Sequence, residues 1–469
     1  MRLASWLTEE GPGAAGRLAQ RLALETGRID DPGALARAAV SAWPERIETL
    51  SEHERDALRL LVAWPWHEPP RANRVGALLG ETHKTPRALR RLIDWGIVLP
   101  HEKPPYTVYE IADEALPLAV EAACGHRLEA IAYRADPPPI IDRGEGRLGE
   151  LFHLLCAARI GALSVTKTGR MYKRSVQAIW QRLQKGQRPI LDALGDFRPT
   201  FFVRLALVLN LLRTDGVHRT IRLGAAATDF LAASPSERLA AALSAWERVI
   251  APRHRRARLL YALLRLAPAS AWAELGSLRR ILTALTEEFI AHCRRNATVS
   301  IGTPAHVESA VCHLLALGLV EAGGSPPRPE TEGPMHSQEL WLRLSPIGQG
   351  FLADGSVPPL APEEGRFIVQ PNFEVVAPPD VAWPLLWKLE ETAALARADQ
   401  ASVYRLDRPS IIGALRAGRT PQEIESFLAA HSRTGLPQNV AYQITAWAGG
   451  FGRVALARAV ILLADTPDL

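Results

Sequence analysis

The stretch YRLDRPSIIGALRAGRTPQEIESFLAAHSRTGLPQNV, Tyr404–Val440, decides the fold of the C-terminal part of this chain. It begins inside the strand-like ASVYRLD (401–407) and continues into two short amphipathic segments, SIIGALRAG and TPQEIESFLAAHS. Gly418 behind the first segment is typical of a helix C-cap, and Thr420 followed by Pro421 is typical of a helix start. The sequence therefore predicts a strand followed by two capped helices.

The flanking segments extend this pattern. FIVQPNFEVVAPP (367–379) nearly alternates apolar and polar residues, which predicts a half-buried strand ended by prolines, and ALARAVILLAD (455–465) predicts a final strand. The segments follow one another as a strand, a helix that follows YRLD, a helix that starts within GxTPxEI, the motif HSxxGLPQNV and a final strand. This order resembles the helicase-associated domain that precedes the motor in XPB-type DNA helicases. The resemblance covers residues 366–469, about a fifth of the chain. It implies a mixed α/β domain that works beside a helicase.

Motifs of a motor are missing from the sequence. A P-loop needs GxxxxGK[ST] to hold phosphates, and the chain contains no Gly-Lys dipeptide. No DExH or DEAD stretch follows an apolar strand, and no GxSxG nucleophile motif is present. We therefore expect no enzymatic activity, no catalytic residues and no cofactor, and the chain resembles the accessory part of a helicase instead of the motor.

Composition and charge narrow the functional class. The 469 residues predict three or four domains at about 150 residues each. Four cysteines without CxxC spacing fit a reduced cytoplasm, and neither a signal segment nor a membrane-spanning run is expected. Residues 146–265 carry 21 Lys and Arg against seven Asp and Glu, whereas both flanks are net acidic. Such a block is expected of a protein that contacts a phosphate backbone, and a solvated arginine face that binds nothing is the alternative.

The first part of the chain predicts a helical lead-in (1–45) and a winged-helix-like domain (46–134). Ser51 with Glu54 forms a capping-box pattern at the start of the first of three predicted helices, and two short strands follow around a Lys-Pro-Pro turn. In a winged helix the third helix commonly enters the major groove. The candidate contacts on that helix share one face: Arg87, Arg90 and Arg91. Protein interaction without DNA contact is the alternative for this domain.

A proline-stiffened linker is predicted at 135–146, followed by a basic domain (147–270) that is helical and winged-helix-like. Its TKTGRMYKR turn places Lys167, Arg170, Lys173 and Arg174 at a turn and at the start of a helix. Cations are unfavourable at the positive end of a helix dipole unless an anion balances them, so a bound phosphate backbone is expected there. Further along, the start of another helix carries four arginines that are expected to extend the phosphate contacts: Arg253, Arg255, Arg256 and Arg258.

A third winged-helix-like domain is predicted at 275–355, with the excursion SPPRPETEGPMHS as a wing tip. The pairs His292-Cys293 and Cys312-His313 lie nearby. Adjacent side chains on a helix point about 100° apart, so one such pair cannot easily supply two zinc ligands, and no metal site is expected.

Together these patterns predict an α-rich α+β protein with winged-helix-like modules and a C-terminal mixed α/β helicase-associated domain. The expected function is non-catalytic binding of duplex or forked DNA through its phosphates, in the cytoplasm (nucleoid), as an accessory to DNA repair, helicase action or transcription. A second contact is expected on the C-terminal domain from Arg405, Arg408, Arg433, Gln438 and Asn439.

An adaptor that docks a separate helicase or nuclease is the main alternative. A sequence-specific transcription regulator is another, but it would need a dimerisation element, and no heptad run is present. No membrane partner is expected.

Overall fold

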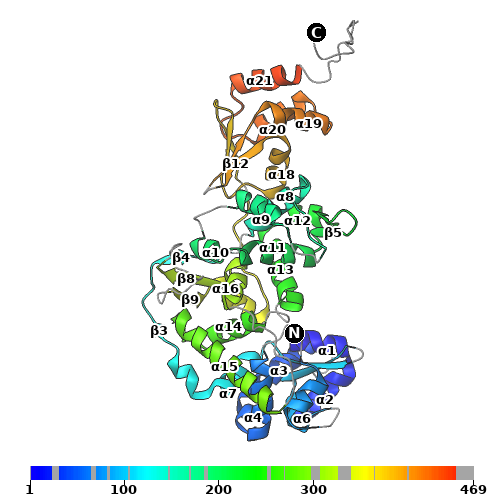
Figure 1. Cartoon of the computed structure of the whole chain (residues 1–469), viewed down its shortest axis with the longest axis vertical. Helices are drawn as coiled ribbons and strands as arrows, with labels where there is room; N and C mark the ends of the chain where they lie inside the picture. The colour runs from blue at the N-terminus through cyan, green and yellow to red at the C-terminus, as the bar shows by residue number, and fades with distance from the viewer. Residues whose placement is uncertain are drawn as a thin grey trace, which may run out of the picture. The chain divides into compact units, whose positions relative to one another are not determined.

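The computed structural model describes residues 2–23, 31–64, 70–81, 85–103, 106–145, 148–167, 171–183, 188–250, 255–268, 270–296, 307–325, 340–363, 365–398 and 401–449. The chain forms two compact units, Met1–Ala361 and Pro362–Leu469 (Figure 1). Helices predominate in both, and every strand pair among the described residues is antiparallel. The predicted α-rich α+β class is therefore confirmed.

The first unit starts with helices that cover its first β-hairpin. The elements are α1 (Leu3–Glu10), α2 (Pro12–Leu22), α3 (Pro32–Glu48), α4 (Glu52–Ala63), α5 (Ala72–Leu78), α6 (Arg87–Asp94), β1 (Val98–Lys103), β2 (Tyr106–Ile111), α7 (Leu116–Cys124) and the 3-10 helix η2 (Gly125–Ala130). The predicted capping box at α4 is confirmed, because Ser51 and Glu54 bond each other's backbone N–H groups. The lead-in, predicted to be helical, consists of α1 to α3, and Leu3, Trp6 and Leu7 bury one face of α1.

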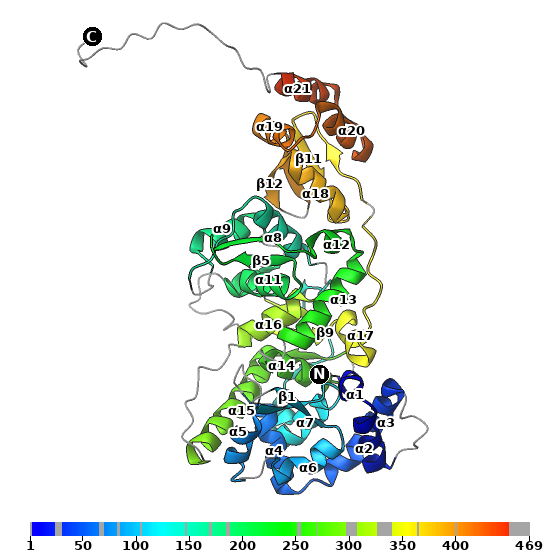
Figure 2. The ribbon, with the colours of Figure 1, turned by 90° about the vertical axis from the view of Figure 1, so that its right-hand side faces the viewer.

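The middle of the first unit carries the basic stretch. It consists of α8 (Gly149–Arg159), α9 (Lys173–Arg182), α10 (Pro189–Ala193), α11 (Phe197–Val208), β5 (Leu212–Asp215), β6 (Thr220–Leu223), α12 (Ala227–Ala232), α13 (Pro235–Ala245) and the π-helix η3 (Trp246–Ile250). Helix α8 packs against α9, α11 and β6, which Figure 2 shows as one group with β5. We call residues 148–250 the middle module.

The last part of the first unit follows directly. Its elements are α14 (Arg255–Arg265), β7 (Trp272–Glu274), α15 (Leu275–Asn296), α16 (Val307–Ala316), β8 (Val320–Gly324), β9 (Leu340–Leu344) and α17 (Pro346–Asp354). The expected wing-tip excursion at 325–337 lies almost wholly outside the described residues.

One order of elements occurs three times in this unit: a helix, a short extended segment, further helices and a β-hairpin. The segment after the first helix pairs each time with the second strand of the hairpin. The three pairings are the Arg71–Val108 bridge onto β2, the Ser164–Thr220 bridge onto β6, and the pairing of β7 with β9. The three occurrences fall close to the modules expected at 46–134, 147–270 and 275–355, although the third begins earlier, at α14.

The predicted linker at 135–146 is wrong in part. Residues Ile140–Asp142 form β4, which pairs with β8, and β3 (Tyr133–Arg134) pairs with β7, so both join a five-stranded sheet of order β3-β7-β9-β8-β4. The proline run packs against this sheet, since a Cβ on Gly323 would lie 2.6 Å from Cγ of Pro138. Sequence-distant strands therefore tie the expected modules into one unit.

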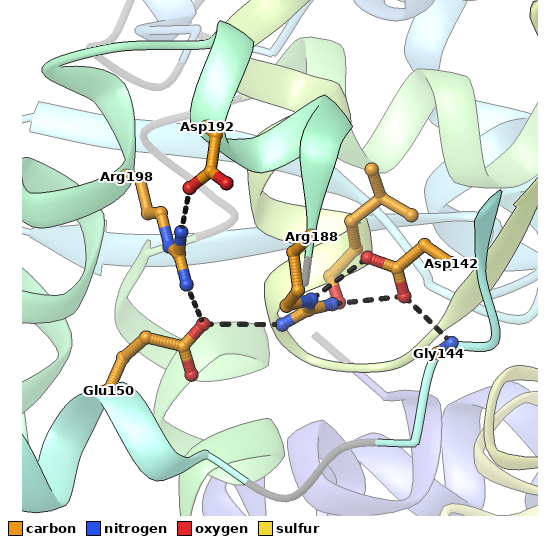
Figure 3. Close-up of polar contacts among 7 residues, drawn as sticks. Asp142, Gly144, Glu150, Arg188, Asp192 and Arg198 are labelled. Atoms are coloured by element: carbon orange, nitrogen blue, oxygen red, sulfur yellow. Dashed lines mark hydrogen bonds and ion pairs between the residues drawn. The ribbon is translucent and has the colours of Figure 1, made fainter. Parts of the chain in front are cut away.

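Charged side chains fasten the middle module to β4 and α16 (Figure 3). The Arg188 guanidinium lies 2.8 Å from Oδ2 of Asp142 and 3.4 Å from Oε1 of Glu150, and it donates to the Leu315 carbonyl at 2.5 Å. Asp142 also accepts from the Gly144 N–H at 3.0 Å. Arg188, directly before α10, is thereby held against the sheet.

Arg198 on α11 completes this network. Its guanidinium is 2% exposed and bonds Glu150 at 2.9 Å, as well as Asp192. Burial by itself would raise the pKa of Glu150, but the charges of Arg198 and Arg188 outweigh it and lower that pKa. Glu150 is therefore held in its charged form inside the unit.

The second unit is built around a four-stranded sheet of order β10-β11-β13-β12. Its elements are β10 (Ile368–Val369), β11 (Glu374–Ala377), α18 (Trp383–Thr392), β12 (Ala394–Ala398), β13 (Ser402–Arg405), α19 (Arg408–Arg416), α20 (Pro421–His431) and α21 (Gln438–Gly449). The predicted start of α20 is confirmed, with Thr420 and Glu423 in a capping box. FIVQPNFEVVAPP forms two paired strands where one was predicted, because the chain turns between Gln370 and Phe373. The expected final strand lies outside the described residues.

Candidate nucleic-acid interface

The basic turn of the middle module lies beside the β5–β6 hairpin. Ser164 bridges to Thr220, and the Val165 N–H donates to the Arg219 carbonyl at 2.8 Å. Lys167 follows two residues later and is exposed. The chain then returns through a Val165–Met171 bridge into α9. Arg170 lies outside the described residues.

Lys173 and Arg174 are exposed in the first turn of α9, where the sequence predicted them. The first turn holds no acidic residue, and the N-cap, Tyr172, makes no side-chain capping bond. Arg174 donates to the Ser164 hydroxyl at 3.3 Å, and its guanidinium carbon lies 5.4 Å from the Tyr172 ring centroid. Two cations thus face the positive end of a helix dipole with no carboxylate at that end to balance them.

The β5–β6 hairpin adds cations that the sequence interpretation missed. Arg213 lies directly opposite Arg222 in the register, and such cross-strand neighbours share one face of a hairpin. The opposite face is apolar, with Leu212 and Ile221 buried. Like charges placed directly opposite each other are destabilising, so this exposed pair is unfavourable in the absence of an anion.

Asp215 shapes the tip of this hairpin. Its carboxylate accepts from the N–H groups of Val217 at 3.0 Å and His218 at 3.1 Å, and it contacts the His218 ring nitrogen at 2.9 Å. The His218 hydrogen bond lowers the pKa of Asp215 to about 2. Arg222 reaches the same carboxylate at 3.5 Å, so it is partly neutralised. Arg213 and Arg219 are exposed, and neither has an ion-pair partner among the described residues.

Around the Lys167 turn, the start of α9 and the β5–β6 hairpin, five exposed cations therefore lie without an acidic partner in the described part of the chain. We call them the middle-module cations: Lys167, Lys173, Arg174, Arg213 and Arg219. A Thr-Asp-Gly turn between strand-like segments was the signal in the sequence for the hairpin that holds the last two.

The candidate contacts on α6 have different surroundings. Arg87 and Arg90 are exposed, as predicted. Arg91 is also exposed, but it bonds Glu54 at 3.0 Å and lies 4.6 Å from the Trp95 ring centroid. Helix α6 is capped by Glu81, whose carboxylate accepts from the Arg87 and Ala88 N–H groups.

Of the four arginines predicted to extend the phosphate contacts at the head of α14, two are not exposed. Arg258 is 8% exposed and bonds the carboxylate of Asp113 and the carbonyl of Ile111, so its predicted phosphate contact is wrong. Arg256 is half-buried and donates to the Thr286 hydroxyl at 3.0 Å. Arg253 lies outside the described residues, as does the side chain of Arg255.

The five candidates on the second unit are all exposed, and three of them lie near opposite ends of β11. Arg405 is paired in register with Glu374 at the start of β11, and Asn439 donates to the Pro371 carbonyl at 2.8 Å just before it. Arg433 lies 3.8 Å from Asp380, beyond the other end of that strand. The two remaining candidates start helices: Arg408 in α19 and Gln438 in α21.

Other kinds of site find little support in the described residues. No group of three or more His, Cys, Asp or Glu among them could hold a metal ion. Cys312 and His313 are buried, and His313 Nδ1 lies 3.4 Å from the indole nitrogen of Trp246. None of the described helices combines the length and apolar character that a membrane span requires.

Comparison with known proteins adds one finding. Residues 367–469 match the family model described as the helicase conserved C-terminal domain. No curated protein matches the chain. The match covers nearly all of the second unit and about a fifth of the chain, and it supports the domain expected from Tyr404–Val440. The match supports a helicase-associated domain in the second unit and suggests a helicase-related role.

Proposed function

We propose that this protein is a non-catalytic nucleic-acid-binding accessory to a DNA helicase, and that it contacts the phosphate backbone of duplex or forked DNA. We base this on the middle-module cations, which are exposed, lie around one hairpin and one helix start, and have no carboxylate partners among the described residues. A phosphate backbone would relieve both the repulsion between Arg213 and Arg222 and the unfavourable helix dipole at α9. Contacts of this kind carry little base specificity.

The repeated order of elements in the first unit supports three winged-helix modules with unequal access to DNA. The third helix of such a module commonly enters the major groove. In the second and third modules this helix is enclosed: α11 exposes only Thr200 and Leu207, and the α16 residues from Ala310 to Ala316 are buried. Helix α6 exposes Arg87 and Arg90. We infer that α6 is the groove-facing helix and that the middle module binds through its turn and hairpin.

The second unit supports an XPB-like placement of the protein beside a helicase motor. The YRLD, TPQEI and GLPQNV segments that carry the resemblance fall on β13, α20 and the start of α21. Because these 469 residues contain no P-loop motif, we infer that a motor working with this unit lies outside them. Purified protein should hydrolyse no ATP above background, with or without DNA; turnover that follows the protein peak through purification would contradict a non-enzymatic role.

Salt-dependent binding tests this function. Each phosphate contact releases counterions, so removing one should flatten the slope of log affinity against log salt by about 0.9 on duplex DNA. We expect the triple variant Lys167→Ala, Lys173→Ala, Arg174→Ala to bind a mixed-sequence duplex more weakly at low salt and with a flatter slope. The matched control removes three exposed arginines from α2, α3 and α4, Arg17, Arg37 and Arg59, and should change neither quantity.

The adaptor function is the second candidate, since the matched domain is helicase-associated. It would become the better proposal if the triple variant folds normally and binds DNA as tightly as the wild type does. A pull-down of a helicase or nuclease that depends on the second unit would then be the expected result.

A further inference from the structure

The tip of the β5–β6 hairpin presents an unusual side chain to solvent. Val217 is 86% exposed, more than any other large apolar residue in the described part of the chain. A lone valine at this position contributes nothing to the core. It is also too small an apolar area to anchor a protein partner, because interface hot spots are dominated by clustered Trp, Tyr and Arg side chains.

The tip that carries Val217 is preorganised. The Asp215 carboxylate holds the Val217 and His218 N–H groups, and Arg219 adopts a left-handed backbone conformation with φ of 53°. One residue into β6 from the tip, the Ile221 N–H donates to the Leu163 carbonyl at 3.0 Å and fixes β6 to the Leu163–Val165 segment. The apolar tip therefore projects from a framework bonded on both sides.

Cations flank this tip on the solvent face. Arg213 and Arg222 stand opposite each other on the two strands, and Arg219 lies two residues beyond Val217. An apolar side chain between phosphate-binding residues is the arrangement with which proteins wedge into a base stack, because the arginines hold the backbone while the apolar group replaces a stacking neighbour.

We propose that the β5–β6 hairpin binds the junction between duplex and single-stranded nucleic acid, with Val217 packed against the last base pair and Arg213 and Arg219 on the backbones of the diverging strands. This inference rests on the proposed nucleic-acid binding and adds to it the structure that is recognised. An uninterrupted duplex offers no exposed base-pair face, so the hairpin discriminates a fork from a duplex without reading bases.

Anisotropy titration of the full chain tests this with a forked duplex and with a duplex of equal paired length whose two ends are closed by loops, so that no terminal base pair is exposed. The wild type should bind the fork more tightly. Val217→Ser should weaken fork binding about five- to tenfold, as expected for a valine that loses its apolar contact, and should leave duplex binding within about twofold. The matched control Ile160→Ser changes another exposed apolar residue of the same module, 63% exposed, and should preserve the fork preference.

A second readout reports on the base pair itself. With 2-aminopurine at the terminal pair of the fork, the wild type should change the fluorescence on saturation, and Val217→Ser should reduce that change at equal occupancy. A fork preference that survives in Val217→Ser, or a wild type that binds fork and duplex equally, would overturn the junction site while leaving the proposed function intact. A wild type that binds neither DNA would overturn both.

Discussion

Arg198 and Arg213 lie in the same basic stretch, yet the fold gives them opposite surroundings. Arg198 is 2% exposed and bonds two carboxylates, whereas Arg213 is exposed and faces another arginine across the hairpin. A buried ion pair that loses one partner leaves an uncompensated charge in a poorly solvated site. An exposed arginine on a strand loses little when it is removed.

Replacing Arg198 by methionine should therefore lower the free energy of unfolding of the first unit by about 3–5 kcal/mol, since Glu150 and Asp192 would remain without their shared partner. Arg213→Met is the matched control and should change it by less than about 0.5 kcal/mol, or raise it slightly. Urea unfolding followed by circular dichroism measures both. Equal effects would mean that the network around Glu150 does not stabilise the unit.

Glu150 predicts the direction of the pH dependence. Its folded-state pKa is lowered by Arg198 and Arg188 despite burial, so its contribution to stability is present above the unfolded value near 4.5 and is lost as the pH falls through the folded value. Glu150→Gln removes this titration. We expect the urea midpoint of the wild type to fall more steeply than that of Glu150→Gln on acidification from pH 7. Parallel curves would contradict a lowered pKa for Glu150.

At the scale of single elements, α9 separates a binding role from a stabilising one. Lys173 and Arg174 oppose its dipole, so replacing both by glutamate should weaken DNA binding while the melting temperature holds or rises. Each favourable charge at the helix start contributes about 0.3–1 kcal/mol to the free energy of unfolding. Lys167→Glu, in the turn before the helix, should weaken binding without this thermal gain. A melting temperature that falls in the double variant would mean that these cations stabilise the fold.

Element starts that depend on neighbouring residues could be predicted from the sequence, as the capping boxes at Ser51 and Thr420 show. The Glu81 cap of α6 could not, because Glu81 lies six residues before Arg87, outside the usual capping position. Arg258 was misplaced for a different reason. The apolar run LLYALLRL that follows it indicates a helix enclosed on most sides, and an arginine inside such a helix is buried.

The division of the whole chain agrees with the acidic, proline-rich stretch at 354–365, which contains the boundary between Ala361 and Pro362. The second unit has its own core, centred on Phe367, Tyr404, Ile411 and Leu428. A fragment of residues 362–469 should therefore fold alone and unfold cooperatively on heating. A molten or insoluble fragment would contradict this, and a fragment ending at Gly449 would then show whether residues 450–469 cause the failure.

Boundaries inside the first unit could not be predicted, because strand pairing there joins residues far apart in the sequence. The proline run at 137–139 suggested a linker, but its neighbour β4 finds a partner only in β8. The candidate site shows the same limit: the turn at Lys167 was evident from local charge, whereas its contact with the β5–β6 hairpin depends on the Ser164–Thr220 bridge.

The pairing of β4 with β8 also has a consequence for synthesis on the ribosome. Ile140 pairs with Gly323, about 180 residues later in the chain. At about 5–20 residues per second, β4 waits on the order of 10–40 s for its partner. During this interval its free edge and the apolar surface beneath it are open to chaperones and to neighbouring nascent chains. Because the exposed strand is open to chaperones during this interval, we expect co-expressed chaperones to raise the yield of monomer, with little change in the stability of the finished protein.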